Sequence, residues 1–486
     1  MDLLDPLDSL MITGELISSP MHVAALMILT PPAGGDHESA RNYIDSIYEQ
    51  ALTAPVDIDR RLRRIPHSGI DTGFRWIWRD IAVSGRELDL RHHFQRRTVR
   101  RDSGIRGLWE LVSDLHALRL DRSAPLWMAY LIDGLPDGRF AFYIKVHHTV
   151  VDGVAGLQMI TGSLSTDPDE RGMPPFYAAK TPARQPERTP GGRSSGPLAA
   201  LRRLADTASA GMELTAKAVR TQLGSAVASL LTPSVAVPFS APPTRFNSSL
   251  GPYRAAAGTS VDRDRIRALQ QAGEVTGNDV VMTIISGALR GWLAERGELP
   301  GRSLVAICPV TVRKHEFAAA DSHGNQFGMG LCPLGTDIDD DARRLELVHN
   351  AMAHIKKQVA EQGPGAMLVT MGPAIGPTIL LPMLPFDTKV PPSFNIPVSN
   401  VPGPPEPMYF NGARLDEIYP VSAIWDGMAL NVTVCSYADQ VSIGYVADRD
   451  VMADVETLVP FTERSLADLE RALGLGPSLG PSPGLQ

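Results

Sequence analysis

Seven consecutive residues carry the clearest chemical signal of the chain: His147-His148-Thr149-Val150-Val151-Asp152-Gly153. They follow a strand-like run, residues 140–146, and precede a helix-like run, residues 154–164. A tight turn between two regular elements can hold a reactive side chain in place and still leave it within reach of a substrate. Imidazole is the side chain best suited to moving protons near neutral pH. The turn therefore predicts a general base.

Two other interpretations of this turn are open. Asp152 could simply cap the following helix, because an aspartate oxygen accepts the unpaired N–H groups of a helix start. Two histidines and one carboxylate could also hold iron or zinc. Adjacent histidines on an extended backbone point in different directions, however, and no second cluster of His, Cys or acidic residues stands out. We therefore expect no metal.

The motif resembles a signature of acyltransferases with the chloramphenicol acetyltransferase-like fold, which condensation domains of peptide synthetases share. Further motifs are similar, in the same order, to those of the bacterial wax ester synthase/diacylglycerol acyltransferase family. These motifs are Pro6-Leu7-Asp8, Pro20-Met21-His22-Val23, residues 120–127 with Pro125-Leu126-Trp127, Asn278-Asp279-Val280-Val281, and residues 309–313, 324–328 and 399–404. The resemblance extends from Asp5 to Leu473.

The resemblance implies two chloramphenicol acetyltransferase-like domains with the active site in a tunnel between them. The pattern of apolar periods by itself indicates a mixed α/β (α+β) protein. We predict an N-terminal domain over residues 1–165, a Pro/Gly-rich linker and helical crossover over 166–241, and a C-terminal domain over 242–473. Residues 474–486 are rich in Gly, Pro and Ser and are predicted to be disordered.

The family's reaction would be acyl transfer from acyl-CoA to diacylglycerol, giving triacylglycerol, and to long-chain alcohols, giving wax esters. The resemblance makes His148 the general base, which takes the hydroxyl proton and returns it to the coenzyme A sulfur. His147 and Asp152 would support the turn, with Arg313 as a candidate partner of Asp152. We find no Gly-x-Ser-x-Gly elbow in a strand–helix context, so direct transfer is the simpler scheme. No cofactor is expected, because acyl-CoA is a substrate.

Three polar residues are candidates for binding the oxyanion of a tetrahedral intermediate or the substrate. Family position suggests Asn278 and its neighbour Asp279, with Asn400 as a further candidate. Asn278 and Asp279 could instead form a plain N-cap of the helix predicted over residues 280–292. Both roles are compatible, since a helix start offers free N–H groups and a positive dipole end.

Two further residues near the motifs are assigned roles in shaping the site. Gly153 would permit a close backbone approach or an unusual φ. Trp127 has no group suited to proton transfer, so it would pack beside the site or line the acyl tunnel.

Length and composition limit the possible functions. A chain of 486 residues exceeds what one core usually organises, so two domains are expected. The net charge of −8 argues against a nucleic-acid partner. No run of about 18 apolar residues predicts a membrane span, and the acidic N-terminus lacks the charge of a secretory signal. Three widely spaced cysteines, Cys308, Cys332 and Cys435, are expected in the core of a protein from a reducing, cytoplasmic environment.

Two segments could touch lipid, and we expect peripheral contact with the inner membrane or with lipid inclusions. Residues 198–231 are Ala-rich with apolar and basic sides, and would either pack on the body or lie on a lipid surface. Residues 372–386 are apolar but interrupted by four prolines, which suits a pocket wall, a lipid-facing patch or ordinary core. An acyltransferase or condensation-type enzyme with another acceptor or a carrier-bound donor is the alternative function, followed by a non-catalytic lipid-binding protein.

Overall fold

The structure is a computed structural model that describes residues 2–16, 18–32, 37–53, 56–179, 234–311, 327–362 and 391–476. The predictions for Arg313, for residues 198–231 and 372–386, and for the tail beyond residue 476 lie outside these described residues.

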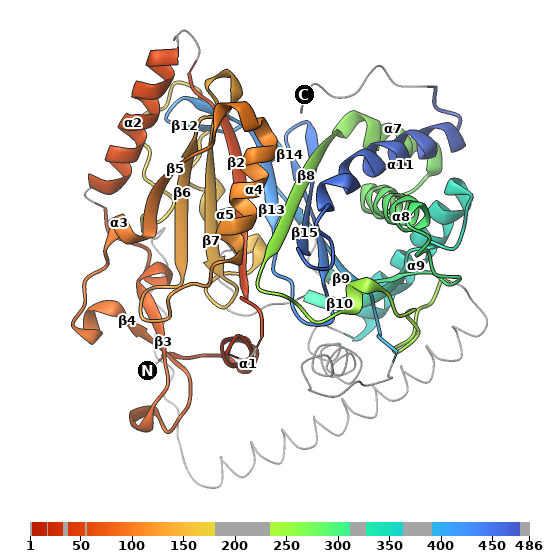
Figure 1. Cartoon of the computed structure of the whole chain (residues 1–486), viewed down its shortest axis with the longest axis horizontal. Coiled ribbons are helices and arrows are strands. Elements are labelled where there is room, and N and C mark those ends of the chain that lie inside the picture. The colour runs from red at the N-terminus through yellow and green to blue at the C-terminus, as the bar shows by residue number, and fades with distance from the viewer. Residues whose placement is uncertain are drawn as a thin grey trace.

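The first large sheet has, within the described residues, six strands in the spatial order β12-β13-β2-β7-β6-β5 (Figure 1). Its strands are β2 (His22–Thr30), β5 (Phe94–Thr98), β6 (Trp127–Asp133), β7 (Phe140–His147), β12 (Tyr409–Phe410) and β13 (Ala413–Val421). Neighbours run antiparallel, except β5 and β6, which are parallel. Residues 409–421 thus complete a sheet whose other strands come from the N-terminal part of the chain.

The second large sheet, again counted over the described residues, has the order β10-β9-β11-β14-β15-β8. Its strands are β8 (Arg254–Asp262), β9 (Val305–Thr311), β10 (Phe327–Pro333), β11 (Ile396–Pro402), β14 (Leu430–Tyr437) and β15 (Gln440–Asp448). The strand β11 is parallel to both of its neighbours, β9 and β14. A mixed sheet of this kind confirms the mixed α/β class.

Side-chain alternation along β7 gives the first sheet two apolar faces. Phe140, Phe142, Ile144 and Val146 point to one face, where α2 (His37–Thr53) and α5 (Gly153–Thr161) pack. Ala141 and the other odd-numbered positions point to the opposite face, which α4 (Gly104–Ala117) covers. A strand that is buried along its whole length carries few polar side chains unless they find partners.

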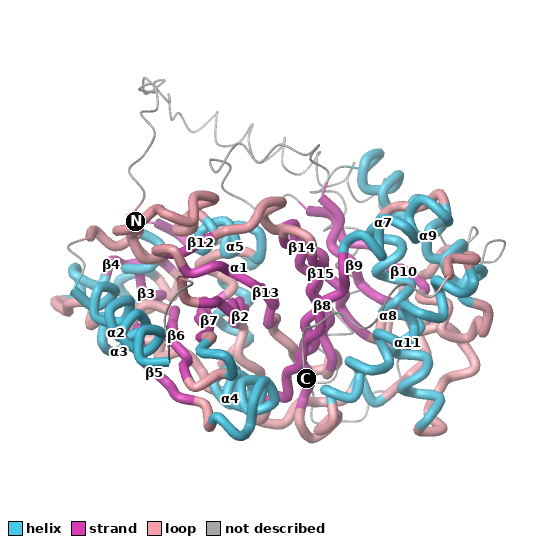
Figure 2. Tube along the Cα trace, turned by 90° about the horizontal axis from the view of Figure 1, so that it is seen from above, coloured by secondary structure: helices cyan, strands magenta, loops and turns pink. Residues whose placement is uncertain are grey.

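Four helices cover the second sheet on the side away from the first sheet (Figure 2). They are α7 (Arg263–Gly273), α8 (Gly277–Glu295), α9 (Asp341–Gln362) and α11 (Leu458–Ala472). Helix α4 lies between the two sheets, where Trp109 packs edge-on against Tyr419 with ring centroids 5.3 Å apart. Gly258 on β8 makes room for both rings, since a Cβ there would lie 2.6 Å from Trp109 and 2.7 Å from Tyr419.

A small third sheet extends from the N-terminal half. It has the order β1-β4-β3, formed by β1 (Asp2–Leu3), β3 (Arg64–His67) and β4 (Ile77–Asp80). Helix α1 (Pro6–Gly14) lies beside it, and Trp76 and Trp78 pack with Leu4 and Ile12 in a separate apolar cluster. The short helix α3 (Leu90–His93) leads from this region back to β5.

The structure confirms the helices and strands predicted around the histidine motif, with ends shifted by a few residues. Residues 166–179 do not run free but pack on the first sheet, where Phe176 and Tyr177 are buried. The predicted domain boundaries stay a prediction. No helix in the described ranges is long and apolar enough to cross a membrane, and all three cysteines are buried and free, as predicted.

Candidate active site

The two histidines lie where β7 ends and the chain turns toward α5. The His148 N–H donates to the carbonyl of Met21 at 2.9 Å, which ties the turn to the start of β2. His148 as a whole residue is partly exposed, unlike its neighbour His147. Its Nδ1 is buried and has no hydrogen-bond partner from another described residue.

The surroundings of His148 favour the neutral imidazole. Burial lowers the pKa of His148 below its ordinary value, and this outweighs the opposing influence of its own backbone and of the Asp152 carboxylate. A neutral ring has a free lone pair and can accept a proton. This is the state that a general base needs before the reaction begins.

His147 is fully buried and held in one tautomer. The Thr149 N–H donates to His147 Nδ1 at 3.2 Å, and the Thr149 hydroxyl lies 2.8 Å from the same atom. An Nδ1 that accepts these donors leaves the ring proton on Nε2. His147 Nε2 lies 3.5 Å from the Glu15 carboxylate, which is ion-pair range rather than a tight hydrogen bond.

Glu15 is the residue of this site that the sequence analysis missed. Its carboxylate, 3% exposed, is 2.8 Å from the Arg122 guanidinium and accepts the Met21 N–H at 3.1 Å. Burial by itself raises the pKa of Glu15, but His147, Arg122 and the Met21 N–H outweigh it and lower the pKa to about 2. Glu15 thus contacts the ring of His147 and holds Met21, the residue that fixes the backbone of His148.

Asp152 caps helix α5. Its Oδ1 accepts the Ala155 N–H at 2.7 Å, the expected geometry of an N-cap. No ion pair to Asp152 is found among the described residues. The prediction of an unusual φ at Gly153 is wrong, since Gly153 does not lie in the left-handed region. A Cβ at Gly153 would make an ordinary 3.7 Å contact with Val401, so the protein's own packing does not require glycine there.

The start of α5 faces β11 of the second sheet. Val401, the neighbour of Asn400, approaches Gly153 as described above, and the Asn400 amide donates to Asn278 Oδ1 at 3.2 Å. The fold therefore brings the histidine turn, Asn400 and Asn278 to one place between the two halves of the molecule. Asn400 is exposed and Asn278 is partly exposed, so their amide groups are open to a ligand.

The predicted N-cap at Asn278-Asp279 is wrong by two to three residues. Helix α8 begins at Gly277, and Thr276 caps it in a reciprocal capping box with Asp279. The Asp279 side chain is buried and also lies 2.8 Å from His349 Nδ1. The Asp279 carboxylate is thus engaged by the helix cap and by His349, and its role as a substrate-binding or oxyanion candidate stays a prediction.

Trp127 packs beside the site, at the start of β6. The ring is fully buried, its Nε1–H donates to the Leu62 carbonyl at 2.9 Å, and it stacks on His93 with centroids 4.5 Å apart. It also contacts Phe176 and Tyr177. In the described part of the chain, no three His, Cys, Asp or Glu side chains are grouped as metal ligands would be.

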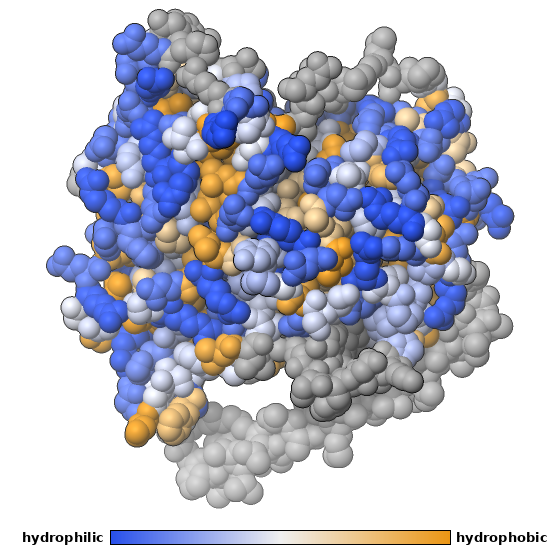
Figure 3. Space-filling model, in the orientation of Figure 1, coloured by the Kyte–Doolittle hydropathy of each residue, from blue (hydrophilic) through white to orange (hydrophobic). Residues whose placement is uncertain are grey.

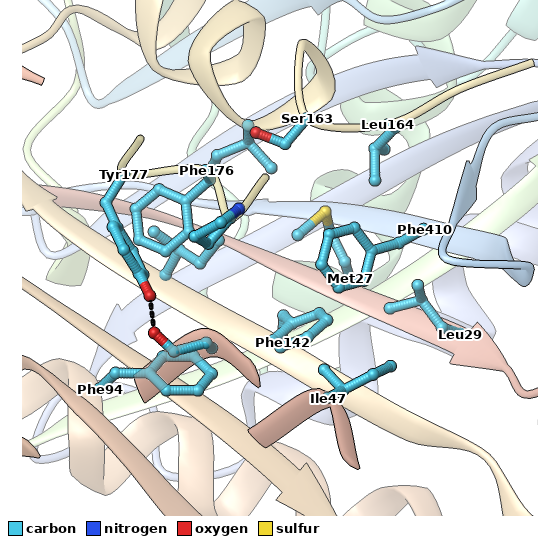
Figure 4. A pocket seen from close by; sticks show the side chains of 14 residues that line it. Met27, Leu29, Ile47, Phe94, Phe142, Ser163, Leu164, Phe176, Tyr177 and Phe410 are labelled. Carbon is cyan, nitrogen blue, oxygen red and sulfur yellow. Dashed lines mark hydrogen bonds between the residues drawn. The ribbon is translucent and has the colours of Figure 1, made fainter. Parts of the chain in front are cut away.

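An apolar pocket lies on the same face of the first sheet as α5 (Figure 4). About 460 Å³ in and around it, including space open to solvent, is free of protein atoms. Its walls come from β2, α2, β5, β7 and the chain after α5, and include Met27, Leu29, Ile47, Ala51, Phe94, Phe142, Ile144, Ile160, Ser163, Leu164, Phe176, Tyr177 and Phe410. Trp127 is not among the lining residues but lies behind Phe176 and Tyr177.

Comparison with known proteins assigns most of the chain to one family. Residues 4–281 match the wax ester synthase/diacylglycerol acyltransferase catalytic domain, and residues 323–470 match the C-terminal domain of the same family. A Mycobacterium tuberculosis protein named as a probable diacylglycerol O-acyltransferase, tgs2, is 36% identical over 98% of this chain and 100% of its own length.

Solved structures indicate the same family and fold. The wax ester synthase/diacylglycerol acyltransferase from Marinobacter aquaeolei VT8 superimposes with a TM-score of 0.74 at 30% identity, covering 98% of this chain and 100% of that one. The first condensation domain of the calcium-dependent antibiotic synthetase shares the fold, with a TM-score of 0.53 at 16% identity over 97% and 96% of the two chains. The chain belongs to the wax ester synthase/diacylglycerol acyltransferase family.

Proposed function

We propose that the protein transfers a fatty acyl group from acyl-CoA to the hydroxyl of diacylglycerol, and also to long-chain alcohols. The observation that carries the proposal is His148: a partly exposed residue with a lowered pKa at the junction of the two halves of a family member. Since Nδ1 is buried, we assign the proton-accepting role to Nε2.

In the proposed reaction, His148 Nε2 takes the hydroxyl proton as the acceptor oxygen bonds to the thioester carbon. The carbon–sulfur bond then breaks, and the same imidazole returns the proton to the coenzyme A sulfur. A base of this kind contributes roughly 10²–10⁴-fold to the rate. His147, Thr149 and Glu15 position the turn, and Asn278 and Asn400 are the proposed donors to the oxyanion. No cofactor or metal takes part in this scheme.

The apolar pocket supports a long-chain substrate. Its nearest wall residue on β7, Ile144, lies four residues before His148, which corresponds to about 13 Å along a strand. A hydrocarbon tail whose reacting end is at His148 could therefore end in this pocket. Each methylene that enters it contributes roughly 0.8 kcal/mol. We place the protein in the cytoplasm, in peripheral contact with the inner membrane or lipid inclusions.

The test is an assay of purified protein with palmitoyl-CoA and a panel of acceptors that includes diacylglycerol and hexadecanol, presented in lipid or detergent. Triacylglycerol or wax ester, together with one free coenzyme A per ester, is the expected product. If no acceptor yields an ester while the protein is folded, the proposed function fails.

A further inference from the structure

The loop that joins β3 to β4 carries two strongly exposed apolar side chains. Ile70 is 87% exposed and Phe74 is 75% exposed. Figure 3 shows apolar atoms projecting from the lower left edge of the molecule, where this loop lies below β3 and β4 in Figure 1. Large apolar side chains at the tip of a projecting loop lose favourable burial, so their position calls for a function.

The loop is held in a strained but fixed conformation. Phe74 has φ +59°, which a bulky residue rarely adopts. The Thr72 side chain, 5% exposed, fastens the loop from inside: its hydroxyl accepts the Gly69 N–H at 3.1 Å and lies 2.8 Å from the Arg75 carbonyl. The Phe74 N–H also donates to the Gly69 carbonyl at 2.8 Å. The two apolar side chains are therefore presented by a rigid support.

Arginine is the most frequent charged residue type around this tip. Residues 60–80 contain six arginines and two aspartates, and five of these arginines pair with Asp2, Asp59, Asp71 or Asp80. Arg75 is exposed directly beside Phe74. Trp76 and Trp78 stand at the base of the loop, and the Arg64 guanidinium lies over Trp78, 5.3 Å from the ring centroid. Apolar tips flanked by Trp and Arg are the composition of protein segments that lie at a membrane interface.

We propose that the β3–β4 hairpin, residues 64–80, anchors the protein to an anionic phospholipid surface by inserting Ile70 and Phe74. A protein partner fits this tip less well. A stable protein interface needs about 800 Å² on each side, and two side chains on a convex loop offer a small part of that. Insertion into a fluid lipid layer needs no complementary shape, and the exposed Arg75 beside Phe74 is placed to meet a phosphate group.

The hairpin is connected to the candidate active site. Trp76 and Trp78 pack in the same apolar cluster as Val150 of the histidine turn and Leu126, the neighbour of Trp127. The Trp76 Nε1–H also donates to Thr13 on α1 at 3.0 Å, two residues before Glu15. A hairpin seated in lipid would thus hold the histidine turn close to the layer that contains the acceptor. This link to catalysis rests on the proposed function, but the binding of the hairpin to lipid does not.

The experiment compares the full-length protein with the double variant Ile70→Glu/Phe74→Glu in vesicle flotation. The vesicles contain phosphatidylcholine and phosphatidylglycerol in equal amounts. The matched control, Val83→Glu/Tyr253→Glu, adds the same two charges at side chains that are 76% and 55% exposed and lie outside the hairpin. All four positions tolerate a polar side chain because they are exposed, so folding is preserved.

We expect the double variant to bind these vesicles at least about tenfold more weakly than the wild type and the control. Wild-type binding should also weaken as salt is raised, because salt screens the arginines. Activity on a short-chain, water-soluble alcohol without vesicles should be unchanged in both variants.

Equal flotation of the wild type and the double variant would overturn the proposal. A changed oligomeric state of the double variant with unaltered flotation would also overturn it, since the tip would then be an interface between copies. Because flotation requires no turnover, a protein that binds vesicles through the hairpin but forms no ester would refute the proposed function and leave the anchor standing.

Discussion

At the scale of single residues, two adjacent histidines have different roles in the site. His147 is buried. Its Nδ1 lies 2.8 Å from the Thr149 hydroxyl, and its Nε2 lies 3.5 Å from the Glu15 carboxylate. His148 is partly exposed and has no partner on Nδ1 from another described residue. We interpret the first as the support and the second as the group that meets the substrate.

The Glu15→Gln variant tests this support. Glutamine keeps a carbonyl oxygen for the Met21 N–H but removes the charge that balances Arg122 and orients His147. We expect kcat to fall by about tenfold or more while KM changes little, because the turn loses its alignment rather than its substrate contacts. A control, Glu110→Gln, alters an exposed carboxylate whose pair with Arg106 is also exposed, and should leave kcat unchanged. An unaltered kcat in Glu15→Gln would refute the positioning role.

The lowered pKa of His148 predicts the acid side of the pH–rate profile. The base form of His148 persists until the pH falls below this lowered pKa. As the pH is lowered past 6.5, the ordinary pKa of histidine, kcat/KM should therefore stay constant at first and decline only at lower pH. Measurement of kcat/KM from neutral to acidic pH checks this. A decline centred above the ordinary histidine value would contradict the burial effect on His148.

Some of these residues could be predicted from the sequence, and others could not. The histidine motif is contiguous, so its position between β7 and α5 could be predicted from local periodicity. Glu15 belongs to no periodic pattern and reaches His147 only after β2 pairs with β7. The sequence predicted the helix start at Asn278-Asp279 instead of Thr276, because all of these residues are good N-caps. Only the backbone geometry distinguishes them.

At the scale of elements, β7 and α5 connect the reacting turn to the apolar pocket. Both lie on the same face of the first sheet, and Ile47 and Ala51 of α2 also line the pocket. The aromatic wall from Phe176 and Tyr177 could not be predicted, since the surrounding residues 165–197 are rich in Pro, Gly and Ser, a composition typical of linkers. Contacts across the fold, rather than local propensity, bury these two rings.

An Ala51→Phe substitution tests whether the pocket holds the acyl tail. The added ring would occupy part of the pocket, so a long chain would lose contact with roughly two methylenes. We expect the preference for palmitoyl-CoA over a shorter acyl-CoA to fall by about tenfold. Gln50→Phe, on the exposed side of the same helix, is the control. If Ala51→Phe leaves the chain-length preference unaltered, the pocket does not hold the acyl tail.

At the scale of the whole molecule, the two halves are joined by strands that cross over. Strand β13 pairs with β2 although nearly 400 residues separate them, which no local pattern in the sequence reveals. The mixed α/β class was predictable because alternation and helical periods persist along the chain. The region where the two halves meet contains buried polar side chains, including His22 and His116, which belong to the core near the histidine turn.

These buried histidines predict a loss of stability in acid. Burial lowers the pKa of His93 to about 4 and that of His116 to about 3, and lowers the pKa of His22 well below its ordinary value. In the unfolded chain each takes up a proton below about pH 6.5. The unfolded state therefore binds more protons, and stability falls as the pH drops from 6.5, by roughly 2 kcal/mol per histidine at pH 5.

Urea unfolding at pH 7 and pH 5 measures this difference. The His93→Gln variant should show a smaller pH dependence than the wild type, whereas substitution of the exposed His92, a lesser contributor to the lowered pKa of His93, should change it much less. A free energy of unfolding that is the same at both pH values would show that these rings do not remain neutral in the folded protein.

The most direct test of the central claim is the rate of the chemical step in a His148→Ala variant, measured in a single turnover with palmitoyl-CoA and diacylglycerol. The exposed-histidine variant His92→Ala serves as the control, and circular dichroism verifies folding. If His148 is the general base, ester formation falls by roughly 10²–10⁴-fold in His148→Ala and not in His92→Ala. A folded His148→Ala protein that forms ester at the wild-type rate would contradict the assignment of the base.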